Sequence, residues 1–510
     1  MLVKTFGCAI IGINAIIVTI EVNSDRGIQF FLVGLPDSSV KESQQRIIAS
    51  FSNLGYKFPR KRITINMAPA DIRKEGAAYD LALAVGVMAV SEQVEAKLLD
   101  QYVIMGELSL DGTLKPVRGI LPMAIQAKQE GFKGIIIPKE NAREAAVVEG
   151  IEVIGAENLT QVIDFLNGTL SIAPERVDMD SLYREDYYEF DFQDVKGQEN
   201  IKRALEIAAA GSHNVLLIGS PGSGKTMLAK RLPSILPPMT LEEALETTKI
   251  HSVAGLMGGN KTLLTKRPFR SPHHSISDAG LCGGGSFPQP GEISLANNGV
   301  LFLDEVPEIQ RHTLEILRQP LEDREITISR AKMSVRFPAN FMLVAAMNPC
   351  PCGYYNHPDR ACVCREGEVQ KYLNKISGPL MDRIDLHVEV LPVPYNELSD
   401  TRRGESSADI RQRVIKARKI QEERFRSNHG IYSNAQMTPQ LLQKHCGLDQ
   451  RSQESLRNAM HRLGLSARAY DRILKVARTI ADLEGSPNIQ FEHLAEAINY
   501  RSLDRDNWGS

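Results

Sequence analysis

Apolar positions in residues 1–168 recur with two periods, one of two residues and one near 3.6. Alternating or continuous apolar runs predict strands over residues 9–22, 29–33, 62–67, 105–110 and 134–137. Helical spacing predicts helices over residues 38–54, 77–90 and 119–130. This block is therefore expected to form a mixed α and β domain.

The apolar run over residues 7–20 follows Lys4 in the manner of a secretory leader. Asn14 interrupts it, no small-residue cleavage site follows, and it passes directly into the alternating residues 19–22. These features favour paired strands. No apolar run reaches the roughly 18–20 residues that a membrane span needs, so we expect a cytoplasmic protein without membrane contact.

The pattern changes twice after residue 168. Residues 169–192 are acidic and rich in tyrosine, without clear periodicity, which is typical of a linker. Residues 193–395 begin with a helix, an apolar strand, a glycine loop and a second helix, the opening of an α/β core with a parallel sheet. Residues 396–510 lose the strand signals and predict a helical C-terminal lid. The expected fold class is α/β multidomain.

Composition narrows the functional classes. The 510 residues carry 60 Lys and Arg against 62 Asp and Glu, a net charge of -2, which excludes a polycation. Any affinity for DNA must come from a local basic channel and must fall steeply with salt. Seven cysteines are too few for a disulfide scaffold and indicate a reducing compartment.

A glycine loop carries the strongest chemical signal. A short apolar strand leads into it, a helix follows it, and together they match the GxxxxGK[ST] pattern in its required context. The predicted nucleotide-binding residues are Gly219, Ser220, Pro221, Gly222, Ser223, Gly224, Lys225 and Thr226. Backbone N–H groups of such a loop converge on phosphate oxygens. Lys225 is expected to reach the β and γ phosphates of ATP, and Thr226 to hold Mg²⁺.

Two further apolar strands end in polar residues. The first ends in Asp304 and Glu305, which a parallel sheet would place beside the glycine loop. Asp304 is expected to support Mg²⁺, and Glu305 to orient or deprotonate the attacking water. The strand over residues 341–346 precedes Asn348, a candidate for positioning that water; a turn-forming Asn-Pro pair is the alternative.

Four cysteines lie within fifteen residues: Cys350, Cys352, Cys362 and Cys364. Four thiolates can surround a tetrahedral Zn²⁺, which predicts a structural zinc site between Asn348 and Arg383. A redox-sensitive thiol group and four free cysteines are the alternatives.

The order of these motifs resembles an AAA+ ATPase of the magnesium-chelatase-related branch. The resemblance implies that Asn348 is the sensor-1 residue and that Arg383 is the finger that reaches a neighbouring subunit's ATP. Arg468 resembles the sensor-2 arginine, acting on its own or a neighbour's nucleotide. In the insert before Asp304, His273 and His274 are interpreted as structural, with ligand or phosphate contacts as the alternative.

Residues 105–112 and 134–142 resemble the Lon-type protease fold. The stretches that match its serine and lysine motifs, 75–80 and 119–124, offer neither a nucleophilic Ser nor an activating Lys, so we expect no peptidase activity. The whole chain resembles the ComM/YifB family.

That family resemblance implies a homo-hexameric, ATP-driven helicase-like motor for branch migration in the recombination of natural transformation. Single-stranded or branched DNA would pass through its central pore, ring closure would depend on nucleotide, and recombination proteins would be possible partners. The alternative is a chelatase-like or chaperone-like ATPase that acts on a protein client.

Overall fold

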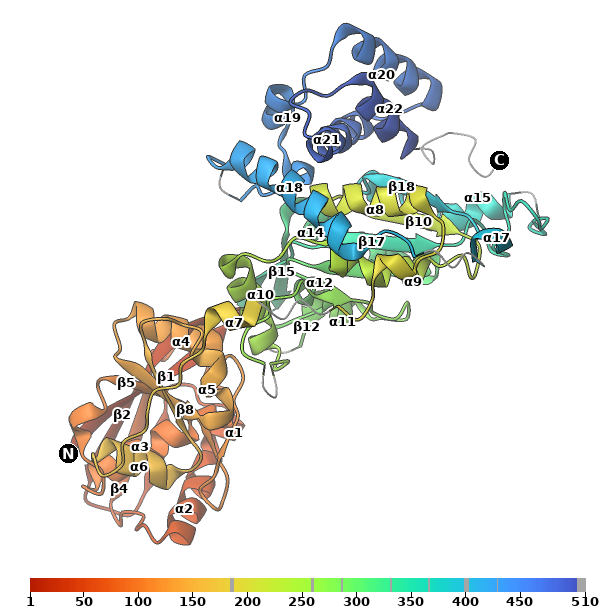
Figure 1. Ribbon diagram of the computed structural model, residues 1–510. Helices are drawn as coiled ribbons and strands as arrows, with labels where there is room; N and C mark the ends of the chain where they lie inside the picture. The colour runs from red at the N-terminus through yellow and green to blue at the C-terminus, as the bar shows by residue number, and fades with distance from the viewer. Residues whose placement is uncertain are drawn as a thin grey trace.

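The computed structural model describes residues 1–183, 188–257, 261–285, 288–330, 333–365, 367–398, 403–428 and 430–501. Figure 1 shows three parts in chain order: an N-terminal α/β part, a central part built on a second sheet, and a group of C-terminal helices beside it.

The N-terminal part is built on a seven-stranded mixed sheet with strand order β3-β4-β2-β1-β5-β8-β9. Its strands are β1 (Leu2–Ile11), β2 (Asn14–Asp25), β3 (Phe30–Val33), β4 (Arg62–Ala68), β5 (Tyr102–Ile104), β8 (Gly134–Pro138) and β9 (Glu152–Ala156). β1, β2 and β4 pair antiparallel, whereas β1, β5, β8 and β9 pair parallel. β3 pairs parallel with β4, so crossover connections occur in both halves of the sheet, and the antiparallel pairs β1–β2 and β2–β4 lie between them.

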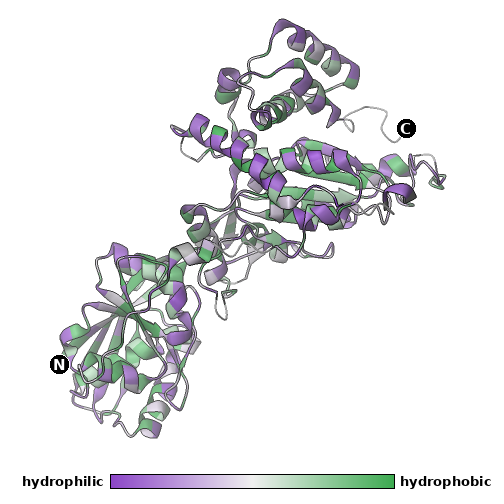
Figure 2. Ribbon diagram, in the orientation of Figure 1, coloured by the Kyte–Doolittle hydropathy of each residue, from purple (hydrophilic) through white to green (hydrophobic). Residues whose placement is uncertain are grey.

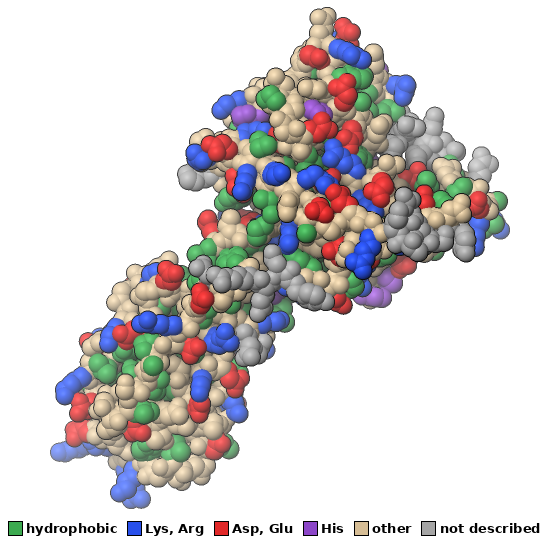
Figure 3. Space-filling view, in the orientation of Figure 1, with side chains coloured by type: hydrophobic (Ala, Val, Ile, Leu, Met, Phe, Trp, Pro, Cys, Tyr) green, Lys and Arg blue, Asp and Glu red, His purple; other side chains and the backbone are tan. Residues whose placement is uncertain are grey.

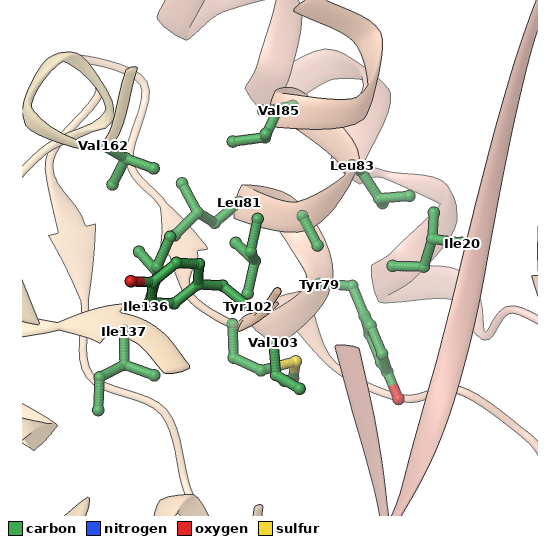
Figure 4. Close-up of a cluster of buried hydrophobic side chains, with 14 of the residues drawn as sticks. Ile20, Tyr79, Leu81, Leu83, Val85, Tyr102, Val103, Ile136, Ile137 and Val162 are labelled. Atoms are coloured by element: carbon green, nitrogen blue, oxygen red, sulfur yellow. The ribbon is translucent and has the colours of Figure 1, made fainter. Parts of the chain in front are cut away.

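Helix α3 (Asp80–Val90) forms the centre of this part, because every one of its residues is buried. Figure 4 shows Leu81 of α3 close to Ile136 of β8 and Tyr102 of β5, with Val85 further along the helix. A Cβ on Gly86 would lie 2.7 Å from the Val22 side chain, so glycine allows the helix to approach the sheet closely. This domain therefore has its own apolar core.

Several elements differ from the sequence prediction in their bounds. The apolar run around residues 9–22, for which the sequence favours paired strands, forms β1 and β2; the two strands extend beyond the expected bounds and are joined by a turn at Gly12, whose φ is 64°. The helix expected at 38–54 is divided at Glu42 into α1 (Ser38–Lys41) and α2 (Ser43–Leu54). The prediction of a strand over residues 105–110 is wrong. β5 ends at Ile104, and within the expected range only Glu107–Leu108 (β6) is a strand, paired with β7 (Leu114–Lys115).

The segment expected as a linker is partly ordered. It carries the short helix α7 (Met179–Tyr183), whose Leu182 packs on a small apolar cluster of Val147, Met239, Ala244 and Leu263. The N-terminal part also contacts α10 (Leu241–Val253) directly. The Glu144 carboxylate accepts hydrogen bonds from Ser252 Oγ at 2.5 Å and from the Leu121 amide at 3.1 Å.

The central part contains a five-stranded parallel sheet with strand order β11-β14-β17-β10-β18. Its strands are β10 (Val215–Gly219), β11 (Phe269–Arg270), β14 (Val300–Leu303), β17 (Met342–Met347) and β18 (Leu386–Val390). β10, β14 and β17 are buried along their whole lengths. Because the strands are parallel, all their carboxyl ends lie at one edge.

The C-terminal helices are α18 (Ser407–Phe425), α19 (Pro439–His445), α20 (Gln450–Leu463), α21 (Ala467–Leu483) and α22 (Phe491–Asn499). α18 and α21 pack on α8 (Glu199–Gly211) of the central part. In Figure 2 the strands of both sheets are mostly hydrophobic and α18 is mostly hydrophilic. Among the described residues, no helix combines the length and apolarity that a membrane crossing requires.

Candidate functional site

The glycine loop connects the carboxyl end of β10 to α9 (Lys225–Arg231). A Cβ on Gly219 would lie 2.3 Å from the Val390 carbonyl oxygen, and Gly222 and Gly224 have φ values of 78° and 94°. Side chains at these three positions would clash or strain the backbone. The backbone therefore needs the glycines that the phosphate-loop pattern requires.

Lys225 lies inside this loop. Its Nζ donates hydrogen bonds to the Gly219 and Ser220 carbonyls at 2.7 and 3.0 Å, and to Asn348 Oδ1 at 3.2 Å. Burial lowers the pKa of Lys225, and the charges of Asp304 and Glu305 oppose that shift. The structure thus brings together the lysine and the asparagine that the sequence singled out after two different strands.

The acidic end of β14 meets the start of α9. Thr226 Oγ1 donates to Asp304 Oδ2 at 2.7 Å, and the other Asp304 oxygen accepts from the Glu305 amide at 2.9 Å. Hydroxyl and carboxylate oxygens are ligands that suit Mg²⁺. Thr226 and Asp304 therefore form a donor pair that fits the metal of a phosphate loop.

Glu305 contacts a residue for which the sequence left two interpretations open. His274 Nδ1 lies 3.2 Å from Glu305 Oε2, and the His273 and His274 ring centroids are 4.0 Å apart. His273 instead contacts Ser275 Oγ at 2.8 Å. Glu305 has φ of 49°, in the left-handed region. His274 is thus part of the site. The sequence separation between His274 and Glu305 did not indicate that the two side chains would be in contact.

Gln198 is a second contact of the loop for which sequence reasoning assigned no role. Its Nε2 donates to the Ser223 carbonyl at 2.9 Å and to the Leu391 carbonyl at 3.3 Å. Gln198 is the N-cap residue of α8 and has a φ of 59°. Its side chain therefore holds the phosphate loop from the side of α8.

The two candidate arginines lie away from this loop. Arg383 is 5% exposed, donates to the Pro379 carbonyl at 2.5 Å and pairs with Glu322. Arg468 is 60% exposed and lies 3.6 Å from Asp382. Arg383 precedes β18, and the other end of β18 pairs with Gly219. β18 has five residues that rise ~3.3 Å each, so the sheet edge near Arg383 and the edge that carries the phosphate loop are roughly 16 Å apart.

The four clustered cysteines come together next to the loop. Their ligand atoms all lie within 4.8 Å of one another, with Cys350–Cys352, Cys352–Cys362 and Cys350–Cys362 sulfur distances of 3.3, 3.6 and 3.8 Å. Zn–S bonds of ~2.3 Å in a tetrahedron place sulfurs ~3.8 Å apart, so the cluster fits one Zn²⁺.

One cysteine of the cluster favours the thiolate form, and the cluster adjoins the phosphate loop. Burial would raise the pKa of Cys352, but backbone N–H groups of Val363 and Tyr354 outweigh it and lower the pKa to about 6. In the same loop, a Cβ on Gly353 would lie 2.5 Å from the Pro221 ring. The cysteine loop therefore packs directly on the phosphate loop.

Comparison with known protein families gives matches along most of the chain. A family model described as "Magnesium chelatase, subunit ChlI" matches residues 191–398, one described as "Subunit ChlI of Mg-chelatase" matches residues 20–141, and one for the C-terminal region of that subunit matches residues 404–501.

Individual relatives span nearly the whole chain. The chain is 47% identical to competence protein ComM of Haemophilus influenzae over 98% of this chain and 97% of the relative. It is 44% identical to the uncharacterized protein YifB of Escherichia coli over 98% of this chain and 96% of the relative. A magnesium-chelatase 38 kDa subunit of Rhodobacter capsulatus is 25% identical, over 62% of this chain and 89% of the relative. Together with the assembled phosphate loop, these similarities show that the chain belongs to the ComM/YifB family of magnesium-chelatase-related AAA+ ATPases.

Proposed function

We propose that the protein is a homo-hexameric ring ATPase that couples ATP hydrolysis to translocation on DNA, with branch migration during natural transformation as its role. The proposal has three parts: the chemistry of ATP hydrolysis, assembly of a ring, and DNA as the polymer that the ring moves.

The residues of the phosphate loop account for the chemistry. Lys225 would hold the β and γ phosphates, and Thr226 with Asp304 would hold Mg²⁺, which would neutralise phosphate charge. Glu305 would take the proton of the attacking water, and Asn348, which contacts Lys225 at 3.2 Å, would position that water.

The observation that carries the ring is the separation of Arg383 from its own phosphate loop. Roughly 16 Å of strand lies between them, so the guanidinium cannot contact ATP bound at Lys225 of the same chain. A finger at this edge can act only on a nucleotide presented by a neighbouring copy, and a closed ring of such heterologous contacts supplies every site with one. Arg468, beside Asp382, lies on the same edge and would act in trans too.

DNA is proposed as the client because the relative with 47% identity is named a competence protein. Several basic residues of the helical region form ion pairs within the chain: Arg413 pairs with Glu206 and Glu405, and Arg424 pairs with Asp482. Exposed cations remain at Lys416, Lys419, Arg457 and Arg462. Figure 3 shows Lys and Arg interspersed with Asp and Glu on this face, so the DNA contacts would be few and local.

Two further assignments accompany this function. The cysteine cluster would hold a structural Zn²⁺ that keeps its loop against the phosphate loop. Residues 1–168 would be a Lon-like domain without the Ser/Lys dyad, used for binding or assembly. The half-buried Ala78 occupies the position nearest the missing nucleophile.

ATP turnover tests the proposal when it is measured with and without single-stranded and branched DNA, at low and moderate salt. Stimulation by DNA that weakens with salt, and that Glu305→Gln abolishes, is the expected result. Stimulation by an unfolded protein in place of DNA would reject DNA as the client and favour the protein-remodelling alternative.

A further inference from the structure

A small polar cavity lies at the edge of the central sheet opposite the phosphate loop. Its volume is about 70 Å³, and residues at the amino ends of the strands line it: Asn214, Gly299, Met342 and Asp385. Side chains of the C-terminal helices, Arg418 and Arg472, close it from the other side. The cavity therefore lies between the sheet and the helical region and is distinct from the nucleotide site.

Arginines dominate the charge of the lining. Arg267, Arg324, Arg418 and Arg472 face the cavity, against two acids, Glu243 and Asp385. Both acids are already paired. Glu243 accepts from Arg267 at 2.9 and 3.1 Å, and Asp385 from Arg472 at 2.8 Å. Two positive charges thus lack a carboxylate in the lining.

Arg418 and Arg324 carry these two charges. Arg418 contacts only neutral acceptors, among them the Ala209 carbonyl at 3.2 Å and Ser212 Oγ, and its Nε has no acceptor among the described residues. The described part of the chain gives Arg324 neither an ion pair nor a side-chain hydrogen bond. Burial, followed by a neighbouring arginine, lowers the pKa of each to about 10.

We propose that this arginine cavity binds one small tetrahedral oxyanion, phosphate or a terminal phosphoryl group. Guanidinium groups bind such oxyanions through paired, charge-assisted hydrogen bonds. The volume exceeds the ~10–15 Å³ that a single water needs, so the cavity can admit a small oxyanion. A bound dianion would neutralise Arg324 and Arg418 and join the sheet to the helical region. This inference does not depend on DNA being the client.

Thermal unfolding of the full chain in increasing phosphate, at constant ionic strength set with chloride, tests the proposal. The Lys225→Ala background weakens phosphate binding at the glycine loop. We expect a saturable rise in Tm of about 3 °C at phosphate well above Kd, retained by the exposed-arginine control Arg457→Gln. Arg324→Gln should lose the rise and should also have a higher Tm in chloride alone, because it removes an unpaired, partly buried charge.

Two results would overturn the proposal: no saturable rise in the Lys225→Ala background, or the same rise in Arg324→Gln as in Arg457→Gln. Equilibrium dialysis with labelled phosphate gives an independent readout, with about one site per chain expected and its loss in Arg324→Gln. ATP in the same background distinguishes the sources. An Arg324-dependent shift with ATP but none with phosphate would assign the site to a nucleotide's terminal phosphoryl group.

Discussion

His274 Nδ1 lies 3.2 Å from Glu305 Oε2, although the two residues are thirty-one positions apart in the sequence. The histidine therefore holds the carboxylate that is proposed to activate water. We expect His274→Ala to lower kcat about tenfold, the effect of a 1.36 kcal/mol rise in the barrier. KM for ATP should stay unchanged, because among the described residues His274 contacts Glu305 and His273 and not the phosphate loop.

Steady-state ATPase assays measure this effect. His312→Ala is the matched control, since His312 pairs with Asp278 at 3.1 Å and lies outside the site. An unchanged kcat in His274→Ala would show that Glu305 is positioned without it, and a large rise in KM would place the histidine in nucleotide binding.

Lys225 and Glu305 are expected to fail in different ways. Lys225→Ala should abolish ATP binding, because it removes the ammonium that lies inside the loop and is placed to hold the β and γ phosphates. Glu305→Gln should bind ATP and lose about 10²- to 10⁴-fold in turnover, the usual contribution of a general base. Fluorescent-nucleotide binding separates the two effects, with the exposed Lys230→Ala as control. ATP binding by Lys225→Ala at wild-type affinity would contradict the assignment.

Arg383 gives the test of the ring. Because it lies at the far edge of the sheet from Gly219, Arg383→Ala should bind ATP normally and lose at least 10³-fold in turnover. Mixing it with Lys225→Ala subunits pairs an intact loop with an intact finger at some interfaces, so part of the turnover should return. Wild-type turnover by Arg383→Ala alone, or no recovery in mixtures that co-assemble, would exclude action in trans.

Much of the ATP site could be predicted from the sequence, because its residues lie in local patterns. Lys225, Thr226 and Asp304 each follow a buried strand of a parallel sheet, and such a sheet brings strand ends together. His274 and Gln198 were not predicted as contacts, since they reach the site through tertiary packing. The arginine cavity was not predicted for the same reason: Arg324, between a helix that ends at Asp323 and a strand that begins at Glu325, and Arg418, inside α18, come together only in the folded chain.

Parts of the fold were likewise predicted from the sequence, and other parts were not. Paired strands are expected in the apolar run over residues 7–20, but the run did not show that the turn between them lies at Gly12. The hairpin of β15 (Glu325–Arg330) and β16 (Met333–Pro338) was not predicted. Its strands carry exposed polar residues on one side, so their apolar signal is weak.

The cysteine cluster predicts a metal requirement. The purified protein should contain about one zinc per chain, and removal of the metal should lower both Tm and ATP turnover, because the loop that carries Gly353 packs on Pro221. Cys362→Ser should reproduce both losses. Cys282→Ser is the control, since Cys282 lies outside the cluster. A folded protein without metal and with full turnover would exclude a structural zinc.

Glu75 predicts a pH dependence in the N-terminal domain. Burial, only partly offset by Arg73 and reinforced by Asp37, raises the pKa of Glu75 to about 7. Its Oε1 receives no hydrogen bond from a described residue. An acid whose pKa is raised by folding is neutral in both states below its unfolded pKa. The folded state then binds the extra proton between pH ~4.5 and 7, so stability is lost as the pH rises through this window.

Glu75→Gln fixes the neutral form and should therefore raise Tm at pH 8 by about 2–4 °C, the shift for ~1 kcal/mol in a domain of this size, and leave Tm unchanged at pH 4.5. The exposed Glu149→Gln is the control and should change Tm equally at both pH values. Differential scanning calorimetry of the three proteins at the two pH values measures the effect. Equal Tm differences for Glu75→Gln at pH 4.5 and pH 8 would mean that this carboxyl titrates alike in the folded and unfolded chain.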